Sequence, residues 1–270
     1  MIEGRIPHDE LATLDRRRFL GVVGTGAALA VLGRIRSPEA DPVLRARNVV
    51  LVHGLYADGS SWARVIGPLL DAGLRVTSVQ NPLTTLADSV AATRRALAMQ
   101  EGPAVLAGHS WSGTIVSEVG DDPKVSALVY VAARAPDAGE DFSALAKGFP
   151  TPPASAGVLT TDGFARLSEA AFLDDFANGV DPATARVLYA AQASNAATLT
   201  SERTTIAAWR AKPSWYAVSK QDRTINPDLE RYLAKRMKAI TVELDAGHLS
   251  LVSHPKEIAA LILAAAHHDA

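Results

Sequence analysis

The chain has 270 residues, enough for one large α/β domain or two small ones, and 48% of them are hydrophobic, enough for a sizeable core. The 27 Lys and Arg residues nearly balance the 29 Asp and Glu residues, so the charge gives no reason to expect nucleic acid as the main partner. No cysteine is present, which excludes disulfides, thiolate catalysis and cysteine-bound metals.

The first forty residues resemble an export signal rather than part of a fold. Arg16 and Arg17 are followed by Arg18, Phe19 and Leu20, and a Gly- and Ala-rich apolar run extends to residue 33. That run of 15 residues is shorter than the roughly 20 that a membrane-spanning helix needs. We therefore expect residues 1–40 to be a twin-arginine-type signal and leader, which would deliver the protein to the periplasm or the exterior of a bacterium without a stable membrane span.

From residue 41 onward, short apolar runs alternate with stretches of helical spacing. Continuous runs such as VVLV and ALVYV indicate strands that are buried on both faces, as a parallel sheet requires. Helical spacing is clear in 62–73, 86–102 and 256–266. The pattern predicts a doubly wound, mainly parallel α/β sheet in a domain spanning 41–270. The six predicted strands are Asn48–Val52, Arg75–Val79, Ala104–Ala107, Val125–Val131, Trp215–Val218 and Ile240–Leu244.

Residues 136 to about 208 interrupt this alternation. They contain no convincing strand, but three helix-like pieces lie at 141–149, 161–179 and 181–192, and a Pro-rich connector lies at 149–157. Asp162 and Asp181-Pro182 have the character of helix starts. We expect this region to be a helical cap inserted between two strands.

The stretch VLAGHSWSGTIVSE, residues 105–118, contains a candidate nucleophile. Ser110 follows an apolar strand and precedes a helix, which is the context of a nucleophile elbow. Gly108 meets the steric demand for a small residue two positions earlier, whereas Ser112 occupies the place where the G-x-S-x-G pattern has glycine, and Gly113 comes one position later. A capping serine in an ordinary Gly/Ser turn is the alternative interpretation.

A serine nucleophile needs a base and an orienting carboxylate. His248 lies in a loop just after the last predicted strand, and Asp222 follows the strand before it, so both should reach the sheet edge where Ser110 lies. The order Ser110, Asp222, His248 is the one expected of α/β-hydrolases. The alternative acids are Asp137, Glu140 and Asp245, whereas Asp228 should be a surface residue at a helix start.

The first strand ends in His53-Gly54, whose glycine allows a tight turn toward the nucleophile. We expect the backbone amides of Leu55 and Trp111 to stabilise the oxyanion. The residues that could contact substrate are His53, Tyr56, Trp62 and His109. Neither G-x-x-x-x-G-K-[ST] nor G-x-G-x-x-G follows this strand, which argues against a nucleotide site.

Taken together, LVHGLYADGSSW, GHSWSG, QDRTINP and DAGHLSLVSHP resemble, in order, the oxyanion, nucleophile, acid and histidine segments of the α/β-hydrolase superfamily. The resemblance covers about residues 48–266. Only about seven residues separate Asp41 from the first strand, so the usual leading hairpin is missing. In this respect the chain is similar to the plant hydroxynitrile lyase and methyl-esterase branch, whose members have a compact six-stranded sheet and a helical cap.

The resemblance implies a serine hydrolase that cleaves small carboxylic esters through an acyl-enzyme, without a metal or an organic cofactor. Two alternatives stay open. One is a lyase or cofactor-free haloperoxidase with the same fold; a lyase would need a lysine near the site, and Lys147, Lys212 and Lys220 are the candidates. The other is a non-catalytic protein that binds a ligand on a hydrolase scaffold. The oligomeric state does not follow from the sequence.

Overall fold

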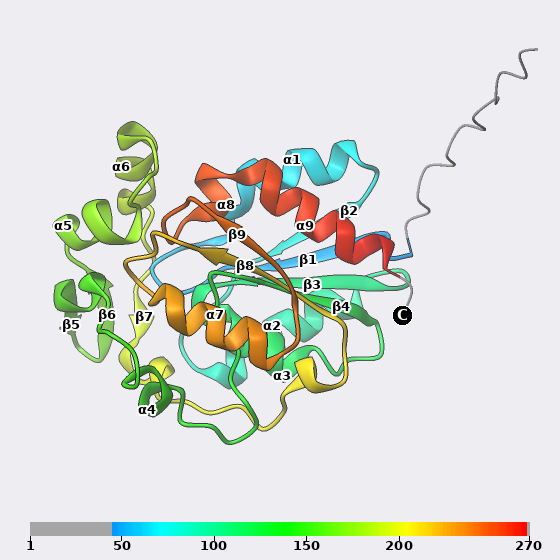
Figure 1. The fold of residues 1–270 in the computed structure, drawn as a ribbon, viewed down its shortest axis with the longest axis horizontal. Coiled ribbons are helices and arrows are strands. Elements are labelled where there is room, and N and C mark those ends of the chain that lie inside the picture. Colours follow the sequence, from blue (N-terminus) through cyan, green and yellow to red (C-terminus); the bar gives the residue numbers. More distant parts are fainter. Residues whose placement is uncertain (1–44, 269–270) are drawn as a thin grey trace, which may run out of the picture. The chain divides into compact units, whose positions relative to one another are not determined.

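The computed structural model describes residues 45–268, so the predicted export signal lies outside the described residues. Six parallel strands form one sheet in the order β2-β1-β3-β4-β8-β9 (Figure 1). The predicted six-stranded parallel sheet is confirmed, and only β3 and β8 extend beyond their predicted ends. The strands are β1 (Asn48–Val52), β2 (Arg75–Val79), β3 (Ala104–His109), β4 (Val125–Val131), β8 (Ser214–Ser219) and β9 (Ile240–Leu244).

Helices cover both faces of this sheet, as a doubly wound topology requires (Figure 1). On one face lie α1 (Ala63–Asp71), α8 (Ser250–Ser253) and α9 (Pro255–His267). On the other face lie α2 (Leu86–Ala98), α3 (Gly113–Val119) and α7 (Pro227–Arg236). The central strands β1 and β3 are fully buried between these two layers, which explains their uninterrupted apolar sequences. No helix in residues 45–268 is both long enough and apolar enough to cross a membrane.

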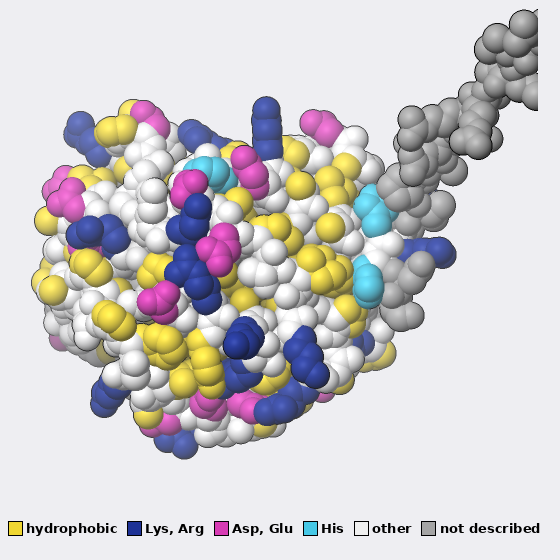
Figure 2. All heavy atoms as spheres, in the orientation of Figure 1, with side chains coloured by type: hydrophobic (Ala, Val, Ile, Leu, Met, Phe, Trp, Pro, Cys, Tyr) yellow, Lys and Arg dark blue, Asp and Glu magenta, His cyan; other side chains and the backbone are white. Residues whose placement is uncertain are grey.

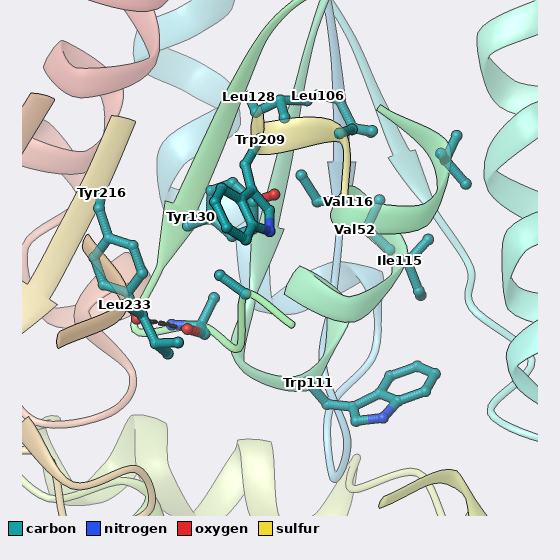
Figure 3. Close-up of a cluster of buried hydrophobic side chains, with 14 of the residues drawn as sticks. Val52, Leu106, Trp111, Ile115, Val116, Leu128, Tyr130, Trp209, Tyr216 and Leu233 are labelled. Atoms are coloured by element: carbon teal, nitrogen blue, oxygen red, sulfur yellow. Dashed lines mark hydrogen bonds between the residues drawn. The ribbon is translucent and has the colours of Figure 1, made fainter. Parts of the chain in front are cut away.

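One of the two apolar cores lies under α3 and α7, and Figure 3 shows its centre. The rings of Tyr130 and Tyr216, from neighbouring strands β4 and β8, are stacked with centroids 6.2 Å apart. The Tyr216 hydroxyl donates to the carbonyl oxygen of Ala133, 2.5 Å away, and accepts from the amide of the same residue at 3.0 Å. The buried core thus fixes the backbone just beyond the end of β4, at the edge where ligands bind in α/β sheets.

The cap between β4 and β8 is not entirely helical, and the expectation that it contains no strand is wrong. It contains the predicted helices α4 (Phe142–Ala146) and α6 (Pro182–Ala190), the latter capped by Asp181. It also holds a small antiparallel sheet, and between the second and third strands of this sheet lie the short helix α5 (Glu169–Ala171) and a π-helical turn at Phe172–Phe176. The strands of this sheet are β5 (Val158–Thr161), β6 (Phe164–Leu167) and β7 (Asn195–Ala196).

Asp162 does not begin a helix but forms the turn between β5 and β6. Its φ angle is 50° and that of Gly163 is 79°, so both central residues adopt the left-handed conformation that a two-residue hairpin turn requires. Asp-Gly is a preferred dipeptide for this turn, and the sequence TDGF therefore carried a hairpin signal. The cap elements gather beside the carboxyl ends of the sheet strands (Figure 1). On the face shown in Figure 2, acidic and basic side chains are interspersed.

Candidate active site

Ser110 lies at a sharp turn between β3 and α3. Its φ angle is 58°, a left-handed conformation that is uncommon for residues other than glycine and that concentrates at functional sites. The residue is buried to 6% exposure, yet it lines a pocket at the end of the sheet. This strained strand–turn–helix geometry is the one expected of a nucleophile elbow.

The departure from the G-x-S-x-G pattern has a steric explanation. At Gly113 a β-carbon would lie 1.8 Å from the carbonyl oxygen of Arg134, so only glycine fits there. Position 112, by contrast, accommodates a side chain, and the Ser112 hydroxyl is completely buried. Its oxygen lies 2.7 Å from the carbonyl oxygen of Val52 and 2.8 Å from that of His109, and it links the ends of β1 and β3.

The loop after β1 passes directly against the nucleophile. A β-carbon at position 54 would lie 2.7 Å from Cβ of Ser110 and 2.8 Å from the carbonyl oxygen of His109, so this close approach requires Gly54. Leu55 and Trp111, the two predicted oxyanion residues, line the same pocket as Ser110. Within the part of the chain that is described, neither backbone amide has a hydrogen-bond partner. Both amides therefore have the hydrogen-bonding capacity that an oxyanion would use.

His248 and Asp222 come together as the sequence predicts. Nδ1 of His248 lies 2.5 Å from Oδ2 of Asp222, and both side chains are fully buried. The other carboxylate oxygen accepts from the amides of Thr224, at 2.6 Å, and Ile225, at 2.8 Å. Nε2 of His248 is buried and has no hydrogen-bond partner among the described residues, so it can accept a proton. The imidazole lies next to the residue before Ser110, with its centroid 4.6 Å from that of His109.

The structure places the alternative acids elsewhere. The side chain of Asp137 pairs with Arg210, and that of Asp245 pairs with Lys220 at 2.6 Å. Glu140 and Asp228 pair with Arg236 and Arg231, respectively. The part of the chain that the structure describes contains no cluster of three His, Asp or Glu side chains able to hold a metal ion.

Three residues expected to contact substrate do not line the pocket, which corrects that expectation. Trp62 is fully buried in the core under α1 and α9. Nε2 of His53 accepts from the amide of Asn81 at 2.9 Å, so its proton is on Nδ1, which lies 2.9 Å from the carbonyl oxygen of Gly54. Nε2 of His109 lies 3.0 Å from the carbonyl oxygen of His248. The two histidines therefore position the backbone around the site, and burial lowers the pKa of both.

Tyr56, the fourth of these residues, does line the pocket. Its φ angle is 59°, which is strained for an aromatic residue, and its ring packs edge-on against Phe176. The pocket has a volume of about 170 Å³, which suits a small substrate. The side chains that form it are Leu55, Tyr56, Ser110, Trp111, Arg134, Ala154, Ser155, Val158, Leu167, Thr200, Thr224 and Ile225.

Glu230 was not identified from the sequence, although it lies on the same face of α7 as the buried Leu233 and Ala234. It is fully buried, and its Oε2 accepts from the amide of Ser219 at 2.9 Å. Burial raises the pKa of Glu230 well above its usual range, and the negative charge of Asp222 raises it further. Oε1 of Glu230 receives no hydrogen bond from another described residue, which agrees with a carboxyl group that keeps its proton.

The raised pKa of Glu230 predicts a pH-dependent effect of Glu230→Gln on stability. As the pH rises above about 4.3, Glu230 loses its proton in the unfolded chain first, so the wild-type protein becomes progressively less stable relative to a variant that cannot ionise. The difference in Tm, variant minus wild type, should therefore increase between pH 5 and pH 8 by roughly 3 °C or more.

Thermal unfolding at pH 5, 6.5 and 8 measures this difference. Glu243→Gln is the matched control, because Arg231 lowers the pKa of Glu243 and the corresponding difference should not increase with pH. If the difference in Tm between Glu230→Gln and the wild type stayed constant from pH 5 to pH 8, Glu230 would be ionised in the folded protein.

Comparison with known proteins agrees with the fold. The profile of the Alpha/beta hydrolase family matches residues 49–261. Among curated proteins, none matches the sequence significantly. Many solved structures share the fold. One is a pyrethroid hydrolase from Sphingobium faniae, with 19% identity and a TM-score of 0.67 over 82% of this chain and 97% of that chain.

Two other structures are similar to the same extent. Polyneuridine aldehyde esterase is 18% identical, with a TM-score of 0.69 over 81% of this chain and 98% of that chain. An extracellular α/β-hydrolase from a Paenibacillus species is 20% identical, with a TM-score of 0.66 over 81% of this chain and 98% of that chain. The family profile covers well over half of the sequence, and the chain therefore belongs to the alpha/beta hydrolase family of enzymes, in its compact six-stranded form.

Proposed function

We propose that the protein is a serine hydrolase that cleaves small carboxylic esters through an acyl-enzyme. The observation that carries this proposal is the buried His248–Asp222 pair, whose imidazole contacts His109, together with the left-handed conformation of the next residue, Ser110, after β3. Several structurally similar proteins are esterases or hydrolases by name, including a methylesterase from Arabidopsis and polyneuridine aldehyde esterase.

In the proposed reaction, Oγ of Ser110 attacks the ester carbonyl carbon while its proton passes to Nε2 of His248. The amides of Leu55 and Trp111 stabilise the oxyanion. When the carbon–oxygen bond of the ester breaks, the alcohol leaves with the proton from His248. A water molecule, deprotonated by His248, then attacks the carbonyl carbon of the acyl-enzyme. His248 returns the proton to Oγ of Ser110 as the free acid leaves, which regenerates the enzyme. Asp222 keeps the proton of the neutral imidazole on Nδ1 and stabilises the imidazolium.

The lysines that a cyanide-releasing lyase would need lie away from the pocket. No lysine is among the described residues that line it. Nζ of Lys220 pairs with Asp245 at 2.6 Å, and Nζ of Lys212 donates to the carbonyl oxygen of Val125 at 2.6 Å. The lining therefore favours ester cleavage over release of cyanide.

A panel of p-nitrophenyl esters of graded acyl length, assayed beside mandelonitrile, tests the proposed function. We expect turnover of the shorter esters, because the pocket of about 170 Å³ holds only a small acyl group, and no release of cyanide. Turnover of the nitrile without turnover of any ester would contradict the proposal.

We also propose that the protein is exported in folded form through the twin-arginine route. Arg16 and Arg17 carry this proposal. Replacing both with lysine should leave the full-length chain inside the cell, whereas the unchanged chain should be recovered from the periplasm or medium. Cell fractionation and immunoblotting measure the export of each chain. Equal export of the two chains would contradict the proposed route.

A further inference from the structure

The pocket beside Ser110 contains one charged side chain, that of Arg134. The other described residues that line the pocket are apolar or carry hydroxyl groups. Arg134 follows β4, and its backbone amide donates to the carbonyl oxygen of Ser110 at 3.0 Å. The pocket of the candidate nucleophile therefore contains a cation.

The backbone of Arg134 is held from several sides. Ala132 has a φ angle of 43°, a strained conformation for a residue other than glycine. Tyr216 binds both backbone groups of Ala133, and the carbonyl oxygen of Arg134 packs against Gly113. Strain that the surrounding contacts maintain is a feature of functional sites. The segment therefore presents the Arg134 side chain at a defined place in the pocket.

Among the described residues, the guanidinium group of Arg134 has no acidic partner. Nη1 donates to the carbonyl oxygen of Thr200 at 3.1 Å, and the group lies 4.8 Å from the ring centroid of Phe142. Within residues 45–268, no Asp or Glu side chain forms an ion pair with it. Other arginines that are at least partly covered do have such partners, for example Arg236 with Glu140 at 2.6 Å.

Burial lowers the pKa of Arg134 to about 10, which leaves the side chain charged at neutral pH. A largely desolvated cation without a counter-ion is unfavourable, and a bound anion would remove that cost. The planar guanidinium suits a carboxylate in particular, because two of its N–H groups can bind the two oxygens. Tyr56 lies close enough to interact with Arg134, and burial raises the pKa of its hydroxyl, so it is protonated and can donate to the same anion.

We propose that Arg134 binds a carboxylate group of the substrate, so that the preferred substrates are small esters that carry a free carboxylate near the scissile bond. This inference rests on the ester hydrolysis proposed above and names its substrate class. It also gives a function to a residue that the ester-cleaving steps themselves do not use.

Matched pairs of esters test the proposal. On the acyl side, mono-p-nitrophenyl glutarate is compared with p-nitrophenyl hexanoate; on the alcohol side, 3-carboxyphenyl butyrate is compared with 3-methylphenyl butyrate. In at least one pair, the wild-type enzyme should have the higher kcat/KM for the anionic ester. In Arg134→Gln the ratio of kcat/KM, anionic to neutral, should fall by about 10- to 100-fold, the cost of losing a hydrogen-bonded charge partner. Arg134→Lys should retain part of the preference.

Arg166→Gln is the control, because it removes the same charge from an exposed position on β6 that does not line the Ser110 pocket. It should leave the ratio unchanged. The carboxylate site would be overturned if the wild-type enzyme had the higher kcat/KM for the neutral ester in both pairs. It would also be overturned if Arg134→Gln lowered kcat/KM equally for both members of a pair. Either result would leave the esterase proposal intact.

A binding measurement separates the two proposals when turnover is absent. Ser110→Ala should bind monomethyl glutarate more tightly than dimethyl glutarate in ligand-observed NMR, and Ser110→Ala/Arg134→Gln should lose that difference. Binding of this kind without ester turnover by the wild type would support the carboxylate site and contradict the esterase proposal. No difference between the two glutarates would overturn the carboxylate site.

Discussion

Ser110→Ala is expected to lower kcat for p-nitrophenyl ester hydrolysis by about 10⁴- to 10⁶-fold, the loss typical of removing a serine nucleophile. The substitution removes the attacking oxygen and leaves the positioning contacts of Gly54 and Ser112 in place. Stoichiometric labelling of the wild-type protein by a fluorophosphonate probe should disappear in the variant.

Ser60→Ala is the matched control, since Ser60 is an exposed serine outside the pocket. It should retain both labelling and hydrolysis. If folded Ser110→Ala, with an unchanged Tm, still hydrolysed the ester at the wild-type rate, Ser110 would not be the nucleophile.

Asp222→Asn is expected to lower kcat by about 10⁴-fold, as for the orienting carboxylate of other triads. The remaining Oδ1 can still accept from the amides of Thr224 and Ile225, so the loop should keep its conformation. The new amide group, however, would face Nδ1 of His248 as a donor and favour the tautomer whose Nε2 carries the proton. That tautomer cannot accept the proton of Ser110.

Asp245→Asn provides the comparison, because Asp245 is three residues from His248 but pairs with Lys220 at the surface. Asp245→Asn should change kcat little, because Asp245 does not contact the imidazole. It should also change stability little, since pairs of exposed charges contribute about 1 kcal/mol or less. An equal loss of kcat in the two variants would mean that Asp222 does not orient the imidazole.

The buried sheet could be predicted well from the sequence, whereas the cap could not. Strands that are covered on both faces need continuous apolar runs, and the buried strands β1 and β4 have the predicted bounds. The edge strands β2 and β9 also have the predicted bounds, although they are only partly buried. The cap strands β5 and β6 are largely exposed, and their sequences have no such run. Only the Asp162-Gly163 dipeptide indicated the hairpin, and helical spacing in the surrounding residues masked that signal.

The candidate site could also be predicted only in part from the sequence. The sequence predicts Ser110, Asp222 and His248 because each follows a recognisable strand at the same edge of the sheet. It does not separate the histidine that pairs with a buried carboxylate from histidines that bind backbone groups, which is why the expected contacts of His53 and His109 with substrate needed correction. Arg134 also follows a predicted strand, but the absence of a counter-ion is a property of the folded chain. That absence has no signature in local sequence.

The link from Ser112 to the ends of β1 and β3 has a consequence for recognising related proteins. A search that demands glycine two residues after the nucleophile would overlook any homologue with serine at that place. In such a protein the position that must lack a β-carbon is the next one, as at Gly113. Restoring glycine at 112 would leave the carbonyl groups of Val52 and His109 without this donor and would loosen the connection between the oxyanion loop and the nucleophile turn. A hydroxyl-bearing residue followed by glycine would be the more informative search pattern for this subgroup.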